Sequence, residues 1–418
     1  MRRVVVTGIG TINSTGHNVK DSFKAVVDGV CGIDTITLFD ASEFSVKIAG
    51  EVKDFDPTTV MDKKEVKKAD RFIQLGIKAA LEAMIDSGYV TQEDKKVDAS
   101  IADRFGMISG SGIGGLSTIE RNSIVCETKG SRKVSPFFIP SSLANMLSGF
   151  ISIEHNLRGP SLSHVTACAA STHALNDAVK TIMIGGADRI LVVGAESAIC
   201  AAGVAGFAEM KALSTRKKKK KKSSRPFDID RDGFVMGEGA GALVVEDLEI
   251  ALARGAKIYA EIIGFGESGD ANHITSPVMD GPLRAMKAAL EMVKSITGEY
   301  PKIDYINAHG TSTPVGDKNE TAAIKALFEG KDIPLVSSTK GQIGHCLGAA
   351  GAIEAIFTLK ALEEGIIPPT INIDNQDPEC DLDYIANVAR KANLTTVMSN
   401  NFGFGGTNGS VIFRRYEK

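Results

Sequence analysis

The sequence lacks cysteine pairs at the spacings that mark zinc sites or disulfide frameworks. Its six cysteines lie at positions 31, 126, 168, 200, 346 and 380, and no C-x-x-C motif occurs among them. The seven histidines also fall outside the spacings of metal-binding motifs, which argues against a zinc site. We expect no secretory signal, and therefore reduced thiols in the cytoplasm.

Long hydrophobic runs and a strong charge of one sign are also missing. The most apolar region, residues 190–208, is interrupted by Glu196 and is rich in Ala and Gly, which favours packing inside a protein over contact with lipid. The chain opens on the strand-like segment VVVTG, so we expect neither a targeting peptide nor a membrane span. The formal net charge of −3 argues against a nucleic-acid-binding protein.

What the sequence does contain is an alternation of short β-branched runs and Ala-rich helical stretches, which predicts an α/β fold. At 418 residues and 43% hydrophobic content, the chain can form two domain-sized halves. The halves follow a similar plan, because RVVVTGIG opens the first and YAEIIGFG the second. We place the boundary near residue 255, which gives halves of residues 1–255 and 256–418.

Cys168 stands at a predicted transition from strand to helix, in PSLSHVTACAASTHALNDAV. Apolar residues then recur every four positions, and Gly185-Gly186 is a stop signal, so Cys168 lies in the first turn of a helix. The free N–H groups and positive dipole end of a helix favour a thiolate and could hold an oxyanion. From this segment alone, a buried structural cysteine remains an equal alternative.

Two histidine motifs in the second half favour a nucleophilic role for Cys168. NAHGTSTPVGD contains His309, and SSTKGQIGHCLGAAGAIEA contains His345 with Lys340 five positions before it. Imidazoles among small residues supply what a thiol nucleophile needs for acyl chemistry. SNNFGFGGTNGS is a glycine-dense segment that we expect to form a loop with Phe402 and Phe404. The remaining histidines are expected to be ordinary hydrogen-bonded residues, and Cys346 a small buried one.

Taken in order, these motifs resemble the β-ketoacyl-acyl carrier protein synthases, and more closely the elongating type II condensing enzymes of bacterial fatty-acid synthesis. The resemblance covers essentially the whole chain and includes RRVVVTGIG, FGMISGSGIGGLSTIE, SPFFIPSSLANM and RPFDIDRDGFVMGEGAGALVVE. It implies a thiolase-type fold, with two duplicated βαβαβαβ halves stacked as five layers (αβαβα), and a homodimer. It also implies a decarboxylating Claisen condensation between an acyl-Cys thioester and malonyl-acyl carrier protein.

The same resemblance implies roles for individual residues. Cys168 takes the acyl chain, His309 and His345 donate hydrogen bonds to the malonyl thioester carbonyl, and Lys340 opposes protonation of a nearby histidine. The backbone N–H groups of Cys168 and Phe404 form a second oxyanion hole, and the Phe404 side chain gates entry of the acyl chain. Substrate contacts are implied for Ile113 in the wall of the acyl pocket and for Thr275, Thr311, Thr313 and Phe402.

Carrier docking and a monovalent cation are implied at further positions. The docking positions are Lys64, Lys67, Lys68, Arg132 and Arg216, and their basic side chains suit an acidic carrier. The run Lys217 to Lys222 follows Arg216, and we interpret it either as a solvated, mobile loop or as an extension of this patch. The expected ligands of a sodium or potassium ion are Asn307, Glu354, Ser399 and Asn400. No other cofactor is expected.

Three rival functions share parts of this pattern. A thiolase or the initiating synthase is disfavoured, because the initiating type pairs its cysteine with His and Asn, whereas here the second partner is His345. A non-catalytic partner subunit is disfavoured by the presence of Cys168. A ketosynthase of a polyketide or other specialised pathway remains the alternative. Departures from the family pattern, Ala-Ala-Ser after Cys168 and KGQIGHC around His345, bear on local packing and chain-length preference.

Overall fold

The computed structural model describes residues 1–216 and 219–417. Its centre is a series of ten hydrogen-bonded strands in the order β10-β9-β13-β14-β8-β1-β7-β6-β4-β5. Strands β1 (Val4–Asn13) and β8 (Ala260–Gly269) are paired only through residues 4–6 and 260–262. The series therefore divides at this short junction into two sheets of five strands.

Both sheets have the same topology. The first consists of β1, β4 (Phe105–Gly110), β5 (Ser161–His164), β6 (Arg189–Glu196) and β7 (Gly239–Asp247). The second consists of β8, β9 (Tyr305–Asn307), β10 (Leu335–Ser337), β13 (Thr396–Gly403) and β14 (Thr407–Arg414). Counted along the chain, each sheet has the spatial order third, second, fourth, fifth, first. In each sheet, the third, second and fourth strands pair in parallel, and the fifth strand is antiparallel to both of its neighbours. The duplication predicted from organisation alone is thus present, with one strand more per half than the expected βαβαβαβ plan.

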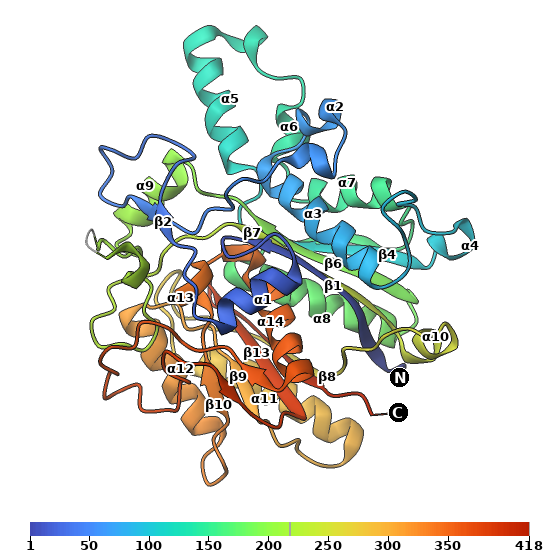
Figure 1. The fold of residues 1–418 in the computed structure, drawn as a ribbon, viewed down its shortest axis with the longest axis vertical. Coiled ribbons are helices and arrows are strands. Elements are labelled where there is room, and N and C mark those ends of the chain that lie inside the picture. Colours follow the sequence, from blue (N-terminus) through green and yellow to red (C-terminus); the bar gives the residue numbers. More distant parts are fainter. Residues whose placement is uncertain (217–218, 418) are drawn as a thin grey trace.

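Helices complete five layers, as predicted. Helices α3 (Arg71–Asp86) and α7 (Met146–His155) cover the outer face of the first sheet, and α11 (Asp280–Thr297) and α12 (Pro314–Leu327) that of the second (Figure 1). Helices α8 (Ala170–Met183) and α14 (Ala350–Glu364) lie between the sheets and contact both. Gly10 of β1 permits the close approach of α3, because a Cβ atom there would lie 2.2 Å from Ala79 O.

Smaller elements connect these layers. The helices are α1 (Val19–Val27), α2 (Lys63–Val66), α4 (Ala99–Ala102), α5 (Leu116–Lys129), α6 (Phe138–Ser142), α9 (Ala201–Glu209), α10 (Leu248–Ala253) and α13 (Lys340–Ile343). The 3-10 turns are η1 (Pro57–Thr59), η2 (Ser131–Lys133), η3 (Ala167–Ala169), η4 (Lys220–Lys222) and η5 (Leu347–Ala349). The short strands are β2 (Asp34–Thr35), β3 (Ile48–Ala49), β11 (Ile366–Ile367) and β12 (Arg390–Lys391). In the described residues, no helix has the length and apolar character needed to cross a membrane.

The glycine-dense segment near the C-terminus is not a loop, contrary to the sequence prediction. Residues 396–403 and 407–414 form the antiparallel strands β13 and β14, joined by a turn at 404–406. The polar side chains that suggested a loop are satisfied inside the protein: Asn401 bonds to Thr172 and Glu354, and Ser410 donates to Asn400. Only the turn, with Gly405 at φ 82° and Gly406 at φ 69°, uses the freedom of glycine.

Candidate active site

The duplication brings two equivalent turns together at the ends of the central helices. Turn η3 contains Cys168 and precedes α8, while η5 follows His345 and precedes α14. The first residue of each turn, Ala167 or Leu347, has a left-handed backbone, with φ of 49° and 47°. Such strained conformations concentrate at functional sites, where the surrounding structure maintains them.

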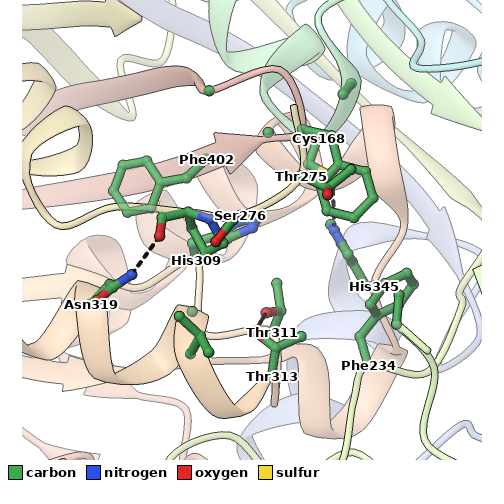
Figure 2. Close-up of a pocket in the computed structure, with 18 of the residues that line it drawn as sticks. Cys168, Phe234, Thr275, Ser276, His309, Thr311, Thr313, Asn319, His345 and Phe402 are labelled. Atoms are coloured by element: carbon green, nitrogen blue, oxygen red, sulfur yellow. Dashed lines mark hydrogen bonds between the residues drawn. The ribbon is translucent and has the colours of Figure 1, made fainter. Parts of the chain in front are cut away.

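Cys168, His309 and His345 lie around one cavity of about 570 Å³. The distance from His345 Nε2 to Cys168 Sγ is 3.1 Å. The rings of His309 and His345 have centroids 5.3 Å apart and are nearly perpendicular, at 85°. Figure 2 shows these side chains around the cavity, with Phe402 beside His309 and Phe234 beside His345. A nucleophilic sulfur and two imidazoles therefore face the same space.

Both imidazoles are held in the neutral state. Burial lowers the pKa of His309 and of His345 well below the usual value, and the positive charge of Lys340 acts in the same direction. Lys340 is itself buried and forms an ion pair with Glu354. A neutral imidazole keeps one N–H group, which can donate a hydrogen bond to a developing oxyanion.

The expected thiolate at Cys168 is not the resting state. Burial raises the pKa of the Cys168 thiol to about 12, although the charge of Lys340 and the backbone N–H groups of Phe404 and Cys168 act in the opposite direction. The loss of water around the buried sulfur outweighs the stabilisation of a thiolate by the N–H groups at the helix terminus. The nucleophile therefore rests as a thiol and must give up its proton during reaction.

The predicted substrate-contact residues, Ile113, Thr275, Thr311, Thr313 and Phe402, line this same cavity, and so does the predicted gate Phe404. Phe404 lies in the turn between β13 and β14, with 37% of its surface exposed. The Thr311 and Thr313 hydroxyls are 3.0 Å apart. The structure thus brings together residues from motifs that are far apart in the sequence.

Two buried carboxylates that the sequence analysis did not single out support the His309 loop. Glu320 accepts hydrogen bonds from the backbone N–H groups of His309 (2.8 Å) and Gly310 (2.7 Å), and Asp317 accepts one from Ser312 (3.1 Å). Burial raises the pKa of Glu320 to about 7 and that of Asp317 to about 6. A signal was available, because Asp317 ends the quoted motif NAHGTSTPVGD and Glu320 follows it, both near the start of the Pro-initiated helix α12.

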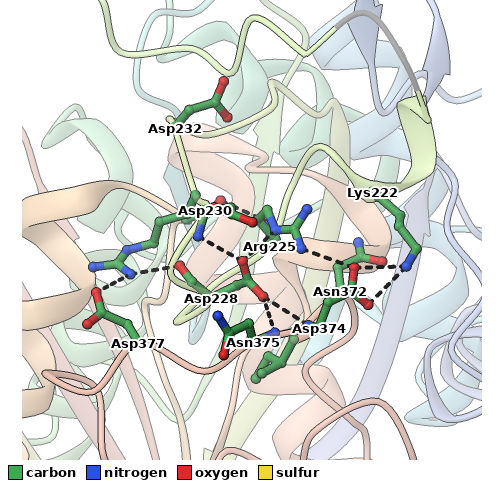
Figure 3. A network of polar contacts seen from close by, with 12 residues as sticks. Lys222, Arg225, Asp228, Asp230, Asp232, Asn372, Asp374, Asn375 and Asp377 are labelled. Carbon is green, nitrogen blue, oxygen red and sulfur yellow. Dashed lines mark hydrogen bonds and ion pairs between the residues drawn. The ribbon is translucent and has the colours of Figure 1, made fainter.

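A network of charged side chains braces the other side of this loop (Figure 3). Arg231 pairs with Asp377 at 2.8 Å and Asp317 at 3.4 Å, and it donates to the carbonyl groups of Thr313 and Pro314. Arg225 pairs with Asp228 at 2.8 Å, and its backbone N–H donates to Ser312 Oγ. The loop that carries the pocket threonines is therefore held by hydrogen bonds to buried carboxylates on one side and to Arg231 and Arg225 on the other.

The basic residues expected to dock a carrier form two separate groups in this chain. Lys64 lies in α2, Lys67 and Lys68 directly after it, and Arg132 in η2. Helices α2, α5 and α6 project together at the top of Figure 1, and Lys68 Nζ lies 5.6 Å from the Phe137 ring. Arg216 instead contacts Asp230 and, at 3.7 Å, Asp232.

The lysine run is not a fully solvated loop. Lys217 and Lys218 lie outside the described residues, while 220–222 form the turn η4. Lys220 Nζ is 3.4 Å from Asp34, and Lys222 Nζ is 2.9 Å from Asp374. Repulsion within the run suggested mobility, but carboxylates far away in the sequence neutralise two of its charges.

Of the four residues expected to bind a monovalent cation, two have side-chain atoms that are unpaired among the described residues and two already have partners. Asn307 and Ser399 are paired neighbours on β9 and β13, and within the described chain the side-chain polar atoms of both are buried without a hydrogen-bond partner. Glu354 already binds Lys340 and Asn401, and the Asn400 side chain contacts Ser410 and Met286. In the described residues, no group of three or more His, Cys, Asp or Glu side chains could hold a metal ion.

A buried cysteine with two neutral imidazoles, at the junction of two duplicated α/β halves, defines a thiol-dependent acyltransferase with a thiolase-like fold. Sequence profiles described as "Beta-ketoacyl synthase, N-terminal domain" and "Beta-ketoacyl synthase, C-terminal domain" match residues 1–251 and 259–374. The chain belongs to the β-ketoacyl synthase family.

Full-length relatives and solved structures agree with this assignment. The chain is 49% identical over 418 residues to 3-oxoacyl-[acyl-carrier-protein] synthase 2 of Vibrio harveyi, covering 99% of both chains. A crystal structure of a β-ketoacyl synthase from Burkholderia phymatum superposes with a TM-score of 0.91 at 35% identity, covering 100% of both chains. A type II polyketide ketosynthase in complex with its acyl-carrier protein superposes with a TM-score of 0.87 at 29% identity, again over 100% of both chains.

Proposed function

We propose that this chain is an elongating β-ketoacyl-acyl carrier protein synthase of fatty-acid synthesis, which lengthens an acyl chain by two carbons. The observation that carries the proposal is the contact of 3.1 Å between Cys168 Sγ and His345 Nε2, in a cavity that His309 shares. The identity of 49% to a full-length 3-oxoacyl-[acyl-carrier-protein] synthase favours this function over a specialised polyketide pathway. Cysteine and imidazole groups carry the chemistry, so the reaction uses no organic cofactor.

The first step transfers the acyl group to Cys168. The sulfur attacks the carbonyl carbon of the acyl-carrier thioester, a new C–S bond forms, and the old C–S bond breaks. The thiol proton is transferred to the departing carrier thiolate, so no net proton is exchanged with water. The backbone N–H groups of Cys168 and Phe404, which point at the sulfur, stabilise the tetrahedral oxyanion.

The second step joins this acyl group to malonyl-carrier. The bond to the malonyl carboxylate breaks, CO2 leaves, and its electron pair forms an enolate whose oxygen accepts hydrogen bonds from His309 and His345. The enolate carbon then attacks the acyl-Cys168 carbonyl, and the C–S bond to the enzyme breaks. Because the pKa of Cys168 is about 12, the released sulfur readily takes up a proton from the medium.

The remaining residue assignments belong to this proposal. Lys340 keeps the imidazoles neutral, Phe404 gates the cavity, and Ile113 forms the wall of the acyl pocket. Thr275, Thr311, Thr313 and Phe402 contact the substrate. We assign Cys168 to a first half, residues 1–255, and the histidines to a second half, residues 256–418.

The partner assignments rest on surface chemistry. We propose a cytoplasmic homodimer that meets through β5, because β5 ends its sheet and exposes Leu162 and Val165 nearby. An acidic acyl carrier protein would dock on Lys64, Lys67, Lys68, Arg132 and Arg216. A sodium or potassium ion would bind at Asn307, Glu354, Ser399 and Asn400, of which Asn307 and Ser399 have buried oxygens that lack partners in the described chain.

Product analysis tests the proposed function. The purified chain is incubated with acyl-carrier and malonyl-carrier, and the products are identified by mass spectrometry. We expect a β-ketoacyl-carrier two carbons longer than the primer and one CO2 per product. Acylation of the enzyme without any condensed product, at primer lengths from short to long, would contradict the proposal.

A further inference from the structure

Glu196 is a buried carboxylate that joins two separate segments of the active site. It ends strand β6 and is fully buried. Its Oε2 atom accepts hydrogen bonds from the backbone N–H groups of Gly112 (2.6 Å) and Gly348 (3.0 Å). Its Oε1 atom accepts from the Ser111 hydroxyl (3.0 Å) and the Ile113 N–H (3.2 Å). One side chain therefore links residues 111–113 to turn η5.

The charge of Glu196 has no cationic partner among the described residues. Burial raises the pKa of its carboxyl group, and the donors that oppose this rise are Gly112, Gly348, Ser111 and Ile113. A buried carboxylate without a counter-ion is tolerated only where fixed donors satisfy its oxygens. Both segments must therefore keep their backbone N–H groups directed at Glu196 for the buried carboxylate to be stable.

Both segments also line the reactive cavity. Ile113 and Leu347 are wall residues of the cavity that contains Cys168, and Leu347 follows His345 by two positions. The backbones approach so closely that a Cβ atom on Gly348 would lie 2.1 Å from Gly112 N and 2.7 Å from Glu196 Oε2. A small movement of either segment would therefore change the shape of the cavity beside the nucleophile.

We propose that Glu196 is a positioning residue that sets the depth of the acyl pocket, by holding Ile113 against the turn that follows His345. The inference rests on the proposed function, because the acyl pocket is part of it. The carboxylate fixes the backbone from which the Ile113 side chain enters the cavity. Without this anion, residues 111–113 move away from η5 and the pocket admits longer chains.

The variant Glu196→Gln tests this role with little change in side-chain volume. An amide has one acceptor oxygen, and its NH2 group faces N–H donors, so at least one backbone N–H loses its partner. Acylation of Cys168 by octanoyl-, dodecanoyl- and hexadecanoyl-pantetheine is followed by intact mass. We expect the ratio of the hexadecanoyl to the octanoyl rate constant to rise about tenfold over the parent ratio, the scale on which pocket shape discriminates between chains.

The variant Glu154→Gln is the matched control, since it removes the same charge from a residue that pairs with Lys95 at 3.1 Å and has 39% of its side chain exposed. For Glu154→Gln we expect the same ratio of hexadecanoyl to octanoyl rate constants as in the parent. The parent ratio in folded Glu196→Gln would overturn the inference, and so would an equal fall in all three rate constants, which a purely structural role predicts. If Glu196→Gln does not fold, Glu196→Asp gives the same test, because it keeps the charge but cannot reach both segments. A parent chain that none of the primers acylates would overturn the proposed function together with this inference.

Discussion

Replacing either active-site histidine with Ala should separate the two half-reactions. His309 and His345 face each other at 85°, with ring centroids 5.3 Å apart, and both have a pKa well below the usual value. Both can therefore donate to the enolate oxygen as neutral groups. Only His345 also contacts the nucleophile, with its Nε2 atom 3.1 Å from Cys168 Sγ.

The magnitude follows from the number of donors that each variant loses. Removal of one preorganised donor to an oxyanion costs about a hundredfold to a thousandfold in rate, or about 2.7 to 4 kcal/mol of barrier. We expect His309→Ala and His345→Ala each to lose CO2 release by this factor. His309→Ala should still acquire the acyl group at nearly the parent rate, whereas His345→Ala should acquire it more slowly, because the thiol has lost its imidazole partner.

Two measurements on the same samples check this division of roles. CO2 release from malonyl-carrier reports the second half-reaction, and the intact mass of the enzyme after incubation with acyl-carrier reports the first. His17→Ala, a histidine outside the cavity that bonds to Lys53 O, controls for the loss of an imidazole. The reasoning would be refuted by parental CO2 release in either variant, or by His309→Ala losing acylation as strongly as decarboxylation.

Three further predictions concern the nucleophile, the pH dependence and the lysine run. Cys168→Ser should abolish the single acyl adduct seen by intact mass, and an adduct of equal yield would exclude Cys168 as the nucleophile. The folded pKa of both site imidazoles lies well below about 6.5, so both remain neutral as pH falls through that value. The rate of CO2 release should therefore fall from protonation of these imidazoles only at lower pH. A midpoint near 6.5 in the pH profile of CO2 release would contradict the lowered pKa values. The same shift makes the imidazole contribution to folding stability, measured as the difference in thermal unfolding between the parent and the His→Ala variants, fall as pH drops below about 6.5, where the unfolded chain takes up protons that the folded site does not. Replacing residues 217–222 with Ser should raise the Michaelis constant for acyl-carrier and weaken its salt dependence, with no change for carrier-free acyl thioesters; an unchanged constant and salt response would show that the run serves only its contacts with Asp34 and Asp374.

Local sequence patterns were sufficient for the fold class and for the order of the main elements. Alternating β-branched and Ala-rich stretches predicted α/β layers, and the apolar repeat after Cys168 predicted the central helix α8. These elements could be predicted because the periodicity of apolar residues within a short segment indicates a helix or a strand. Strand β13 was not predicted, because its polar side chains suggested a loop. In the folded chain, Asn401 forms hydrogen bonds with residues that are distant in the sequence.

Long-range packing decided the electrostatics of the site. Cys168 and His345 are 177 positions apart, and their contact, the enclosure of the sulfur and the nearby charge of Lys340 exist only in the folded chain. The resting thiol, the ion pairs of Lys220 and Lys222, and the donors around Glu196 follow for the same reason. A pKa depends on how much water a group loses and on which charges surround it, and the sequence determines both only by folding. The sequence by itself therefore determined which groups react, and the tertiary structure decided in which protonation state they meet.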